Sequence, residues 1–288
     1  MDDHSNAAAM ADDPAANVAR IESQSSVLTT VADGSAMTWR AWGAGEPLVL
    51  LHGGYGSWTH WIRNIEPLSR DYRVLVPDMP GYGDSPLPAA IATMSDFARI
   101  VAAGLDQVIP KGQPYRLAAF SFGCAVATHL LALQHKRIRR LVIVGTSGLG
   151  PRRAVREEMR RWRDMPSAEA RNDAHRHNLG VLMIHDKERI DPLAVHLQSR
   201  NTERAATRHG TLRTSADRKQ MMLAHPVPLA GIWGGKDAMS ESFMDQRAAA
   251  LREVDPQASI RIIPDAGHWV QYEAAPAFND ALLDLLRG

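Results

Sequence analysis

Short apolar runs that alternate with helical segments are the feature that most limits what this chain can fold into. The runs are apolar rather than alternating in polarity, and they lie at residues 46–54, 72–85, 115–120, 139–146, 228–234 and 258–268. Continuous apolar strands are typical of a parallel sheet that is covered on both faces. Because strand and helix alternate along the chain, the sequence predicts an α/β fold with a mostly parallel, doubly wound sheet.

Helical patterns fill the intervals between these runs, at residues 58–70, 95–109, 122–134, 242–254 and 276–288. The second pattern begins at Ser95, a residue type that often caps a helix N-terminus. Near the start of the chain, Asp33-Gly34 lies between two runs of alternating polarity. This arrangement predicts an antiparallel hairpin at the edge of the sheet.

Residues 149–219 do not follow the alternation of strand and helix patterns. They are rich in Arg and His, show helical periodicity, and contain 16 Lys and Arg against 10 Asp and Glu. Ligands in open α/β sheets bind at the carboxyl ends of the strands, so we predict a helical lid inserted after the sixth strand, over that edge. The α/β core would then comprise residues 18–148 and 220–288. Residues 1–17 offer little to bury and are predicted to be a disordered tail.

Composition excludes several classes of function. With 33 basic and 32 acidic residues, the net charge of +1 gives no indication of nucleic-acid or membrane-surface binding. The single cysteine, Cys124, excludes an internal disulfide. The first residues are acidic and lack a basic region followed by an apolar run, so we expect no secretory leader. No stretch reaches the ~20 apolar residues that a transmembrane helix needs. We therefore expect a cytoplasmic protein.

Ser121 lies at the junction between the run at 115–120 and the helical segment at 122–134. Its surroundings, Ala119-Phe120-Ser121-Phe122-Gly123, place small residues two positions on either side, with alanine at the first, where glycine is usual. Such a pattern permits a sharp strand-to-helix turn that projects the central hydroxyl. Serine also suits a helix N-cap, so the sequence leaves two interpretations open, a cap and a nucleophile.

Asp237 and His268 each lie just after a predicted strand, and the chain order is Ser121, Asp237, His268. The carboxyl ends of parallel strands meet at one edge of a sheet, so these residues can converge. A serine hydroxyl becomes nucleophilic when an imidazole accepts its proton, and a carboxylate fixes the tautomer of that imidazole. The three residues form a candidate catalytic triad; the structural alternatives are a turn aspartate and a loop histidine.

A glycine-containing stretch, His52-Gly53-Gly54, follows the first apolar run. A carbonyl carbon that Ser121 attacks develops an oxyanion, which backbone N–H groups can stabilise. The amide of Phe122, directly after the candidate nucleophile, could supply one donor. Gly54 is the candidate for the other, because glycine allows close approach of substrate to backbone; a plain glycine turn is the alternative.

The motifs LHGGYG, PDMPGYGDS, AFSFGC, GGKD and DAGHWVQYE together resemble those of the α/β-hydrolase superfamily. They run from about residue 45 to the C-terminus and cover the chain apart from the predicted lid. The resemblance implies that Ser121 is the nucleophile, Asp237 the acid and His268 the base. It also implies that Gly54 and Phe122 are the oxyanion-hole donors. We expect no cofactor and no metal.

Within the superfamily, the chain is most similar to esterases and meta-cleavage-product hydrolases, since Trp269 directly follows the histidine. That group has an asparagine before the nucleophile, where this chain has Phe120, and a lid arginine, for which Arg200 is the candidate. We expect Gly53, Phe120, Arg200 and Trp269 to contribute to substrate binding. Haloalkane dehalogenases and epoxide hydrolases use an aspartate where this chain has serine. Cofactor-free perhydrolases share the Ser-Asp-His set, so the sequence alone does not exclude them.

The sequence therefore predicts an enzyme, a serine hydrolase that cleaves a small or medium carboxylic ester by an acyl-enzyme mechanism. A C–C bond hydrolase acting on meta-cleavage-type diketone acids is the alternative. A ligand-binding protein of the hydrolase fold with little turnover is an alternative of another class. The expected partner is a small-molecule ester or ketone, with no nucleic acid and no membrane, and a homodimer is left open.

Overall fold

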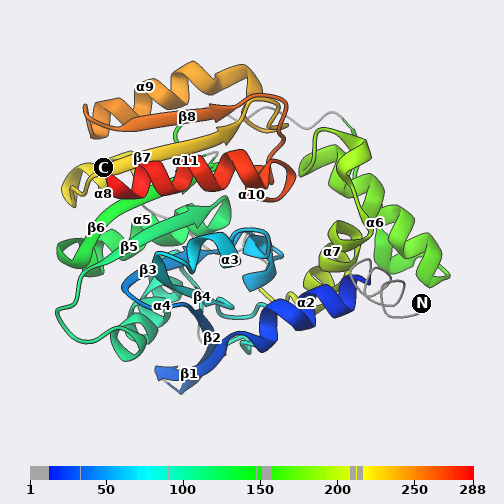
Figure 1. The fold of residues 1–288 in the computed structure, drawn as a ribbon, viewed down its shortest axis with the longest axis horizontal. Helices are drawn as coiled ribbons and strands as arrows, with labels where there is room; N and C mark the ends of the chain where they lie inside the picture. Colours follow the sequence, from blue (N-terminus) through cyan, green and yellow to red (C-terminus); the bar gives the residue numbers. More distant parts are fainter. Residues whose placement is uncertain are drawn as a thin grey trace, which may run out of the picture.

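Eight strands form one sheet in the computed structural model, which describes residues 13–32, 34–89, 91–146, 148–150, 157–207, 212 and 217–288 (Figure 1). The spatial order is β1-β2-β4-β3-β5-β6-β7-β8. The strands are β1 Ser26–Ala32, β2 Ser35–Trp42, β3 Glu46–Leu51, β4 Tyr72–Pro77, β5 Tyr115–Phe120, β6 Ile138–Val144, β7 Leu229–Gly234 and β8 Ser259–Ile263.

Pairing in the sheet is parallel from β4 through β3 and β5 to β8, and antiparallel from β1 through β2 to β4. The predicted α/β-hydrolase fold with a mostly parallel sheet is confirmed. The predicted hairpin is β1 and β2, whose register runs from Ser26 opposite Ala41 to Ala32 opposite Ser35. Asp33 of its predicted turn lies outside the described residues.

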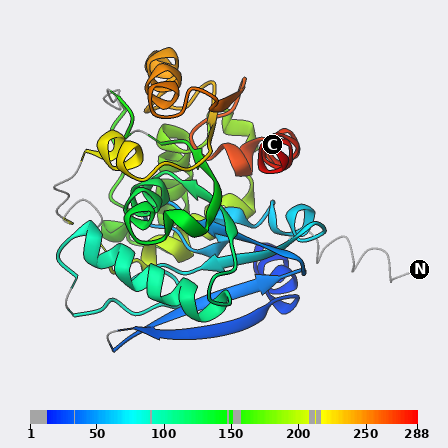
Figure 2. The ribbon, with the colours of Figure 1, turned by 90° about the vertical axis from the view of Figure 1, so that its left-hand side faces the viewer.

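Helices cover both faces of the sheet (Figure 2). On β5, Leu117 belongs to the apolar cluster that includes α4 and α5, and Ala118 to the cluster that includes α11, because successive strand residues point to opposite faces. No helix that the structure describes is long and apolar enough to cross a membrane. The α-helices are α2 Pro14–Ser23, α3 Ile65–Leu68, α4 Met94–Val108, α5 Phe122–Gln134, α6 Ala168–Leu182, α7 Pro192–Arg204, α8 Arg218–Ala224, α9 Met244–Val254, α10 Val270–Glu273 and α11 Ala275–Arg287.

Burial along the strands follows their place in the sheet. Central strands β3, β5, β6 and β7 are almost wholly buried, as their apolar sequences predict. Strand β8 differs, since Arg261 and Ile262 are exposed. The expectation that this run is covered on both faces is wrong because β8 is the last strand in the sheet order and has a neighbour on one side only.

The prediction of one continuous helix at residues 58–70 is wrong. The structure has a 3-10 helix at Trp58–Trp61 and a separate short α3 at Ile65–Leu68. Pro67 lacks an N–H and is tolerated only in the first turn of a helix, so an α-helix must begin close before it. Between the two pieces, the buried Asn64 side chain donates to Asn279 Oδ1 at 2.7 Å and ties this segment to α11.

The prediction that residues 1–17 are disordered is wrong for the last residues of this segment, which are helical. Helix α2 begins at Pro14, and Asp13 caps it by accepting from the backbone N–H of Ala15 at 3.0 Å. Val18 and Ile21 on this helix are buried. The cap orders the start of α2, and the burial of two apolar residues three positions apart stabilises the helix. The composition of the tail did not indicate either feature. Residues 1–12 of the predicted tail lie outside the described residues.

The segment predicted as a lid contains α6, α7 and short 3-10 turns in its described parts, and these parts contain no strand. Helices α6 and α7 lie beyond the arrowheads of the parallel strands, which is the carboxyl edge of the sheet (Figure 1). Helix α8 starts at Arg218 and continues to Ala224, past the predicted boundary at residue 219.

The start of α4 differs from the sequence prediction by two residues. Thr93, rather than Ser95, is the N-cap, with its hydroxyl accepting from the N–H of Asp96 at 3.1 Å. The Asp96 carboxylate accepts in return from the N–H of Thr93 at 3.0 Å. This reciprocal capping box satisfies two donors at once, and it leaves Ser95 exposed inside the first turn.

We predict that Thr93→Ala lowers the free energy of unfolding by about 1 kcal/mol, because α4 loses its cap. The matched variant Ser95→Ala should change it by less than about 0.5 kcal/mol, as expected for an exposed position without such a role. Urea unfolding of both variants measures the difference. A larger loss for Ser95→Ala would show that the helix is capped at Ser95.

Candidate active site

Ser121 occupies a strained turn between β5 and α5. Its backbone has φ 51° and ψ −108°, a conformation that residues other than glycine rarely adopt. The Ser121 N–H donates to the carbonyl of Val144 on β6 at 2.9 Å. The hydroxyl makes no capping hydrogen bond to the helix. Of the two interpretations that the sequence left open, the side-chain cap is therefore wrong, and the hydroxyl is available for other contacts.

Small residues around Ser121 make this turn possible. A Cβ placed on Gly123 would lie 2.8 Å from the backbone oxygens of both Leu51 and His52. Backbone cannot move aside as a flexible side chain can, so only glycine lets α5 start this close to β3. Ala119 is fully buried and opposes Leu51 in the sheet, where its methyl group fits.

The structure brings Ser121, His268 and Asp237 together in one hydrogen-bonded chain. His268 Nε2 lies 3.0 Å from Ser121 Oγ, and His268 Nδ1 lies 2.9 Å from Asp237 Oδ2. An ionised carboxylate can only accept, so Nδ1 carries the ring proton and Nε2 is free to accept from the serine hydroxyl. Asp237 is fully buried and His268 is 2% exposed, which protects the contact between them from water.

Two opposing effects act on the carboxyl group of Asp237. Burial alone would raise its pKa, but the His268 imidazole and the N–H of Met239, at 2.9 Å from Oδ1, stabilise the charged form. The net result is a pKa below the ordinary value for aspartate. Asp237 is therefore ionised at neutral pH and can hold the tautomer of His268.

The loops that carry Asp237 and His268 are in backbone contact. A Cβ on Gly234 would collide with the carbonyl oxygens of Ala266 and Gly267, so the chain needs glycine at the end of β7. Glu273, which the sequence analysis did not single out, is buried and accepts from the N–H of Gly267 at 2.7 Å. Its carboxylate also accepts from the N–H of His185 at 3.0 Å and thereby links the His268 loop to the segment between α6 and α7. In the sequence, the available signal was the position of this glutamate, five residues after the histidine.

A pocket with a volume of about 430 Å³ opens above Ser121 and His268. Its other walls combine apolar side chains with three arginines, Arg160, Arg163 and Arg218, and the described lining includes no Asp or Glu. The apolar walls are Phe120, Phe122, Met159, Trp162, Leu182, Met183 and Met239.

The predicted binding residues divide between this pocket and other places. Gly53, Gly54, Phe120 and Phe122 line the pocket. Trp269 does not: it is fully buried, donates through Nε1 to the carbonyl of His60 at 2.9 Å and stacks on Tyr272. The prediction that Trp269 contacts substrate is not supported, because its indole packs inside the core.

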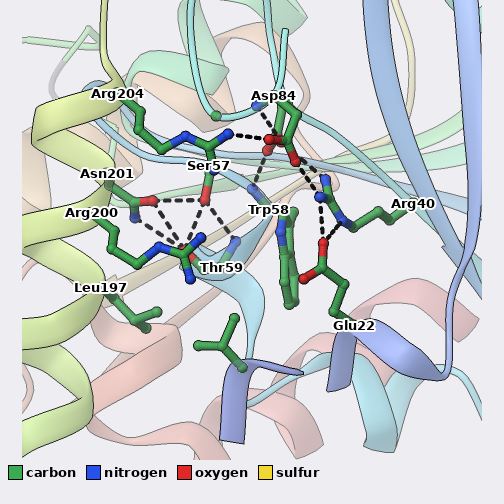
Figure 3. Close-up of a pocket in the computed structure, with 13 residues that line it drawn as sticks. Glu22, Arg40, Ser57, Trp58, Thr59, Asp84, Leu197, Arg200, Asn201 and Arg204 are labelled. Atoms are coloured by element: carbon green, nitrogen blue, oxygen red, sulfur yellow. Dashed lines mark hydrogen bonds and ion pairs between the residues drawn. The ribbon is translucent and has the colours of Figure 1, made fainter. Parts of the chain in front are cut away.

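Arg200 lies on the opposite side of α7 from the candidate active site. Gln198 and Thr202, four residues apart on one helix face, line the pocket above Ser121, whereas Arg200 stands about 200° around the helix from each. It lines a separate pocket of about 250 Å³ with Asn201 and Arg204 (Figure 3). The predicted role of Arg200 as the substrate-binding lid arginine is therefore not supported.

The second pocket contains the links between α7 and the core (Figure 3). Asn201 accepts from the hydroxyl of Ser57 at 2.8 Å, and Arg204 pairs with Asp84. Asp84 also pairs with the buried Arg40, so it fixes the loop after β4. Within the described residues, no group of three or more His, Cys, Asp or Glu side chains could hold a metal ion.

Comparison with known proteins relates the chain to hydrolases. A sequence model described as "Alpha/beta hydrolase family" matches residues 48–281. A 2-hydroxy-6-oxo-6-phenylhexa-2,4-dienoate hydrolase from Burkholderia cepacia is 28% identical over 272 residues, covering 85% of this chain and 88% of the relative. The carboxylesterase CesB (YbfK) from Bacillus subtilis has a TM-score of 0.75 at 19% identity, covering 95% of this chain and 96% of that one, which shows the shared fold alone.

A further relative is longer than this chain. The dihydrolipoyllysine-residue acetyltransferase component of the acetoin cleaving system of Pseudomonas putida is 27% identical over 259 residues. The match covers 84% of this chain but 64% of that protein, so the chain spans less than two thirds of that relative.

Cys124, one turn along α5 from Ser121, is predicted to be unreactive in the folded protein. Its thiol is 1% exposed and donates to the carbonyl of Ala119 at 2.9 Å, and burial raises its pKa to about 11. Iodoacetamide at pH 8 should leave the folded chain unmodified and alkylate the urea-unfolded chain once. Rapid alkylation of the folded chain would contradict this packing.

Proposed function

The chain belongs to the alpha/beta hydrolase family, and on that basis we propose that it is a serine hydrolase that cleaves a small or medium carboxylic ester. One observation carries the proposal. The hydroxyl of Ser121 lies 3.0 Å from an imidazole nitrogen whose tautomer a buried carboxylate holds, at the floor of a pocket. A serine in that arrangement can become a nucleophile.

In the proposed first step, Ser121 Oγ attacks the ester carbonyl carbon while His268 Nε2 takes the hydroxyl proton. The carbonyl oxygen becomes an oxyanion, and the backbone N–H groups of Gly54 and Phe122 are the proposed donors that stabilise it. The tetrahedral intermediate then collapses, the C–O bond to the alcohol breaks, and His268 gives its proton to the departing alcohol oxygen. An acyl group remains on Ser121.

In the proposed second step, water attacks the acyl carbon while His268 accepts one of its protons. Collapse of the second tetrahedral intermediate breaks the bond to Ser121 Oγ, and His268 returns the proton to that oxygen. The carboxylic acid leaves and the serine is restored. Asp237 stays ionised in both steps and stabilises the imidazolium that forms each time.

Hydrolysis of a C–C bond in a diketone acid is the second candidate, and a specific observation favours it. Arg160 and Arg163 line the pocket, and the described lining includes no Asp or Glu, which favours a substrate that carries its own carboxylate. The relative from Burkholderia cepacia is named as a hydrolase of a dienoate, an acid of this kind. The residues in this chain that would receive the carboxylate are these two arginines, in place of Arg200.

Ser121→Ala should lower kcat for a p-nitrophenyl ester by about 10⁴-fold or more, since the nucleophile is lost. A fluorophosphonate should add once to the wild type and not to the variant, as intact mass would show. Ser95, an exposed serine that is not among the residues lining the pocket, provides the control Ser95→Ala, which should behave as wild type. Ester turnover in Ser121→Ala within tenfold of wild type would exclude the mechanism.

A wild type that binds a ligand saturably but takes no fluorophosphonate label would instead favour the alternative of a ligand-binding protein with little turnover.

Arg163→Gln and Arg160→Gln, made singly, should each raise KM about tenfold for an ester that bears a second, free carboxylate. This corresponds to the loss of one charge-assisted contact of about 1.4 kcal/mol. In both variants, KM for a neutral ester of the same length should change by less than about twofold. Arg200→Gln is the matched control on the far side of α7. Equal effects on neutral and anionic esters would contradict a carboxylate-binding role.

A further inference from the structure

Two buried histidines hold the peptide groups on either side of Gly53. His52 Nδ1 lies 2.7 Å from the carbonyl oxygen of Gly53. On the other side, the N–H of Gly53 points to His60 Nδ1 at 3.2 Å. His52 is fully buried and His60 is 2% exposed, so water does not compete for either contact.

The backbone partners fix the tautomer of each ring. A backbone N–H can only donate, so Nδ1 of His60 must be unprotonated, and the ring proton lies on Nε2. His52 has the opposite arrangement. Its Nε2 accepts from the N–H of Met79 at 3.0 Å, so its proton lies on Nδ1 and is donated to Gly53. Both rings are neutral, with opposite tautomers.

These contacts bear on the direction of the Gly54 N–H. The peptide bond between Gly53 and Gly54 is trans and planar, so its carbonyl and its N–H point in opposite directions. Holding the Gly53 carbonyl against His52 therefore turns the Gly54 N–H away from that ring. Glycine restricts its own backbone least of all residues, so Gly53 needs both contacts to keep one orientation.

The imidazole of His60 is itself tightly held. Its ring lies 5.6 Å from the ring of Phe120 and 5.1 Å from that of Trp269. A Cβ on Gly56 would collide with the imidazole, which packs directly on that glycine. The carbonyl of His60 accepts from the indole of Trp269. Trp269 thus contributes to the site by holding His60.

Surrounding groups keep His60 neutral. Burial lowers the pKa of His60 well below the ordinary value, and the nearby His52 and His268 lower it further. Burial likewise lowers the pKa of His52, to about 4. Protonation of His60 would place an N–H against the N–H of Gly53, so the hydrogen bond exists only with the neutral ring.

We propose that His60 is a positioning residue for the oxyanion hole: its unprotonated Nδ1 fixes Gly53 and, together with His52, the direction of the Gly54 N–H. The role rests on the proposed acyl transfer at Ser121, because it concerns the donor to the oxyanion of that reaction. His60 itself is not among the residues that line the pocket. It acts through the backbone and touches no reacting atom.

Two amide variants separate this role from simple packing. In His60→Asn the side-chain oxygen can take the place of Nδ1 and accept from Gly53, whereas in His60→Gln the acceptor lies one carbon farther out, near the place of Nε2. We expect His60→Asn to keep kcat within about threefold of wild type, and His60→Gln to lose at least about tenfold. Removal of one oxyanion donor costs about 10² to 10³ in kcat, so misorientation should cost less. KM should stay within about twofold in both, because ground-state binding is unchanged.

Equal loss of kcat in His60→Asn and His60→Gln would overturn the proposal, since packing alone would then explain both. So would activity in both variants equal to wild type. Fluorophosphonate labelling of Ser121 in each variant separates these outcomes from failure of the proposed function, which would also remove labelling from wild type.

A measurement on the wild type needs neither a variant nor a substrate. Nitrogen-15 NMR of the imidazole rings should show His60 with a protonated Nε2 and a bare Nδ1, and His52 with the reverse. Resonances of His60 that show a protonated Nδ1 at neutral pH would overturn the proposal even if ester hydrolysis is confirmed.

Discussion

The site depends on one constraint, a serine held in a backbone conformation that serine seldom adopts. The φ of 51° at Ser121 costs about 1–3 kcal/mol, which the surrounding structure must offset. The hydrogen bond from Ser121 to Val144 and the close approach of Gly123 to β3 hold the turn in place. Helix α5, which follows, is buried along nearly its whole length. Because the turn is held so firmly, the hydroxyl is withdrawn from capping the helix and directed to His268.

Three buried histidines around the pocket differ in their partners, and the partners decide what each can do. His268 lies between a carboxylate and a hydroxyl, so it can take up a proton and keep the resulting charge. His52 and His60 have backbone partners, which fix one tautomer each, and burial lowers the pKa of both rings. The same side chain can thus serve as a base beside Ser121 and as a rigid support behind Gly54.

Much of the fold was predictable from the sequence because apolar strands and capped helices leave strong local patterns. The positions of Ser121, Asp237 and His268 at strand ends were sufficient to predict that they meet. Contacts that depend on which face of a helix carries a residue were not predictable. Arg200 lies in the stretch of sequence where a lid arginine was expected, but it stands on the far face of α7. The support that His60 gives to Gly53 was also hidden, because it depends on a ring packed against Gly56 and Trp269.

An acyl group on Ser121 during turnover is the most direct consequence of the proposed chemistry. The measurement is acid quenching of the wild type within milliseconds of mixing with excess p-nitrophenyl acetate, followed by tryptic digestion and fragmentation of peptide 117–136. An acetyl group located at Ser121, and absent after the substrate is exhausted, is the predicted result. Steady turnover with an unmodified Ser121 at every quench time, or with the acyl group on another residue, would contradict an acyl-enzyme at this serine.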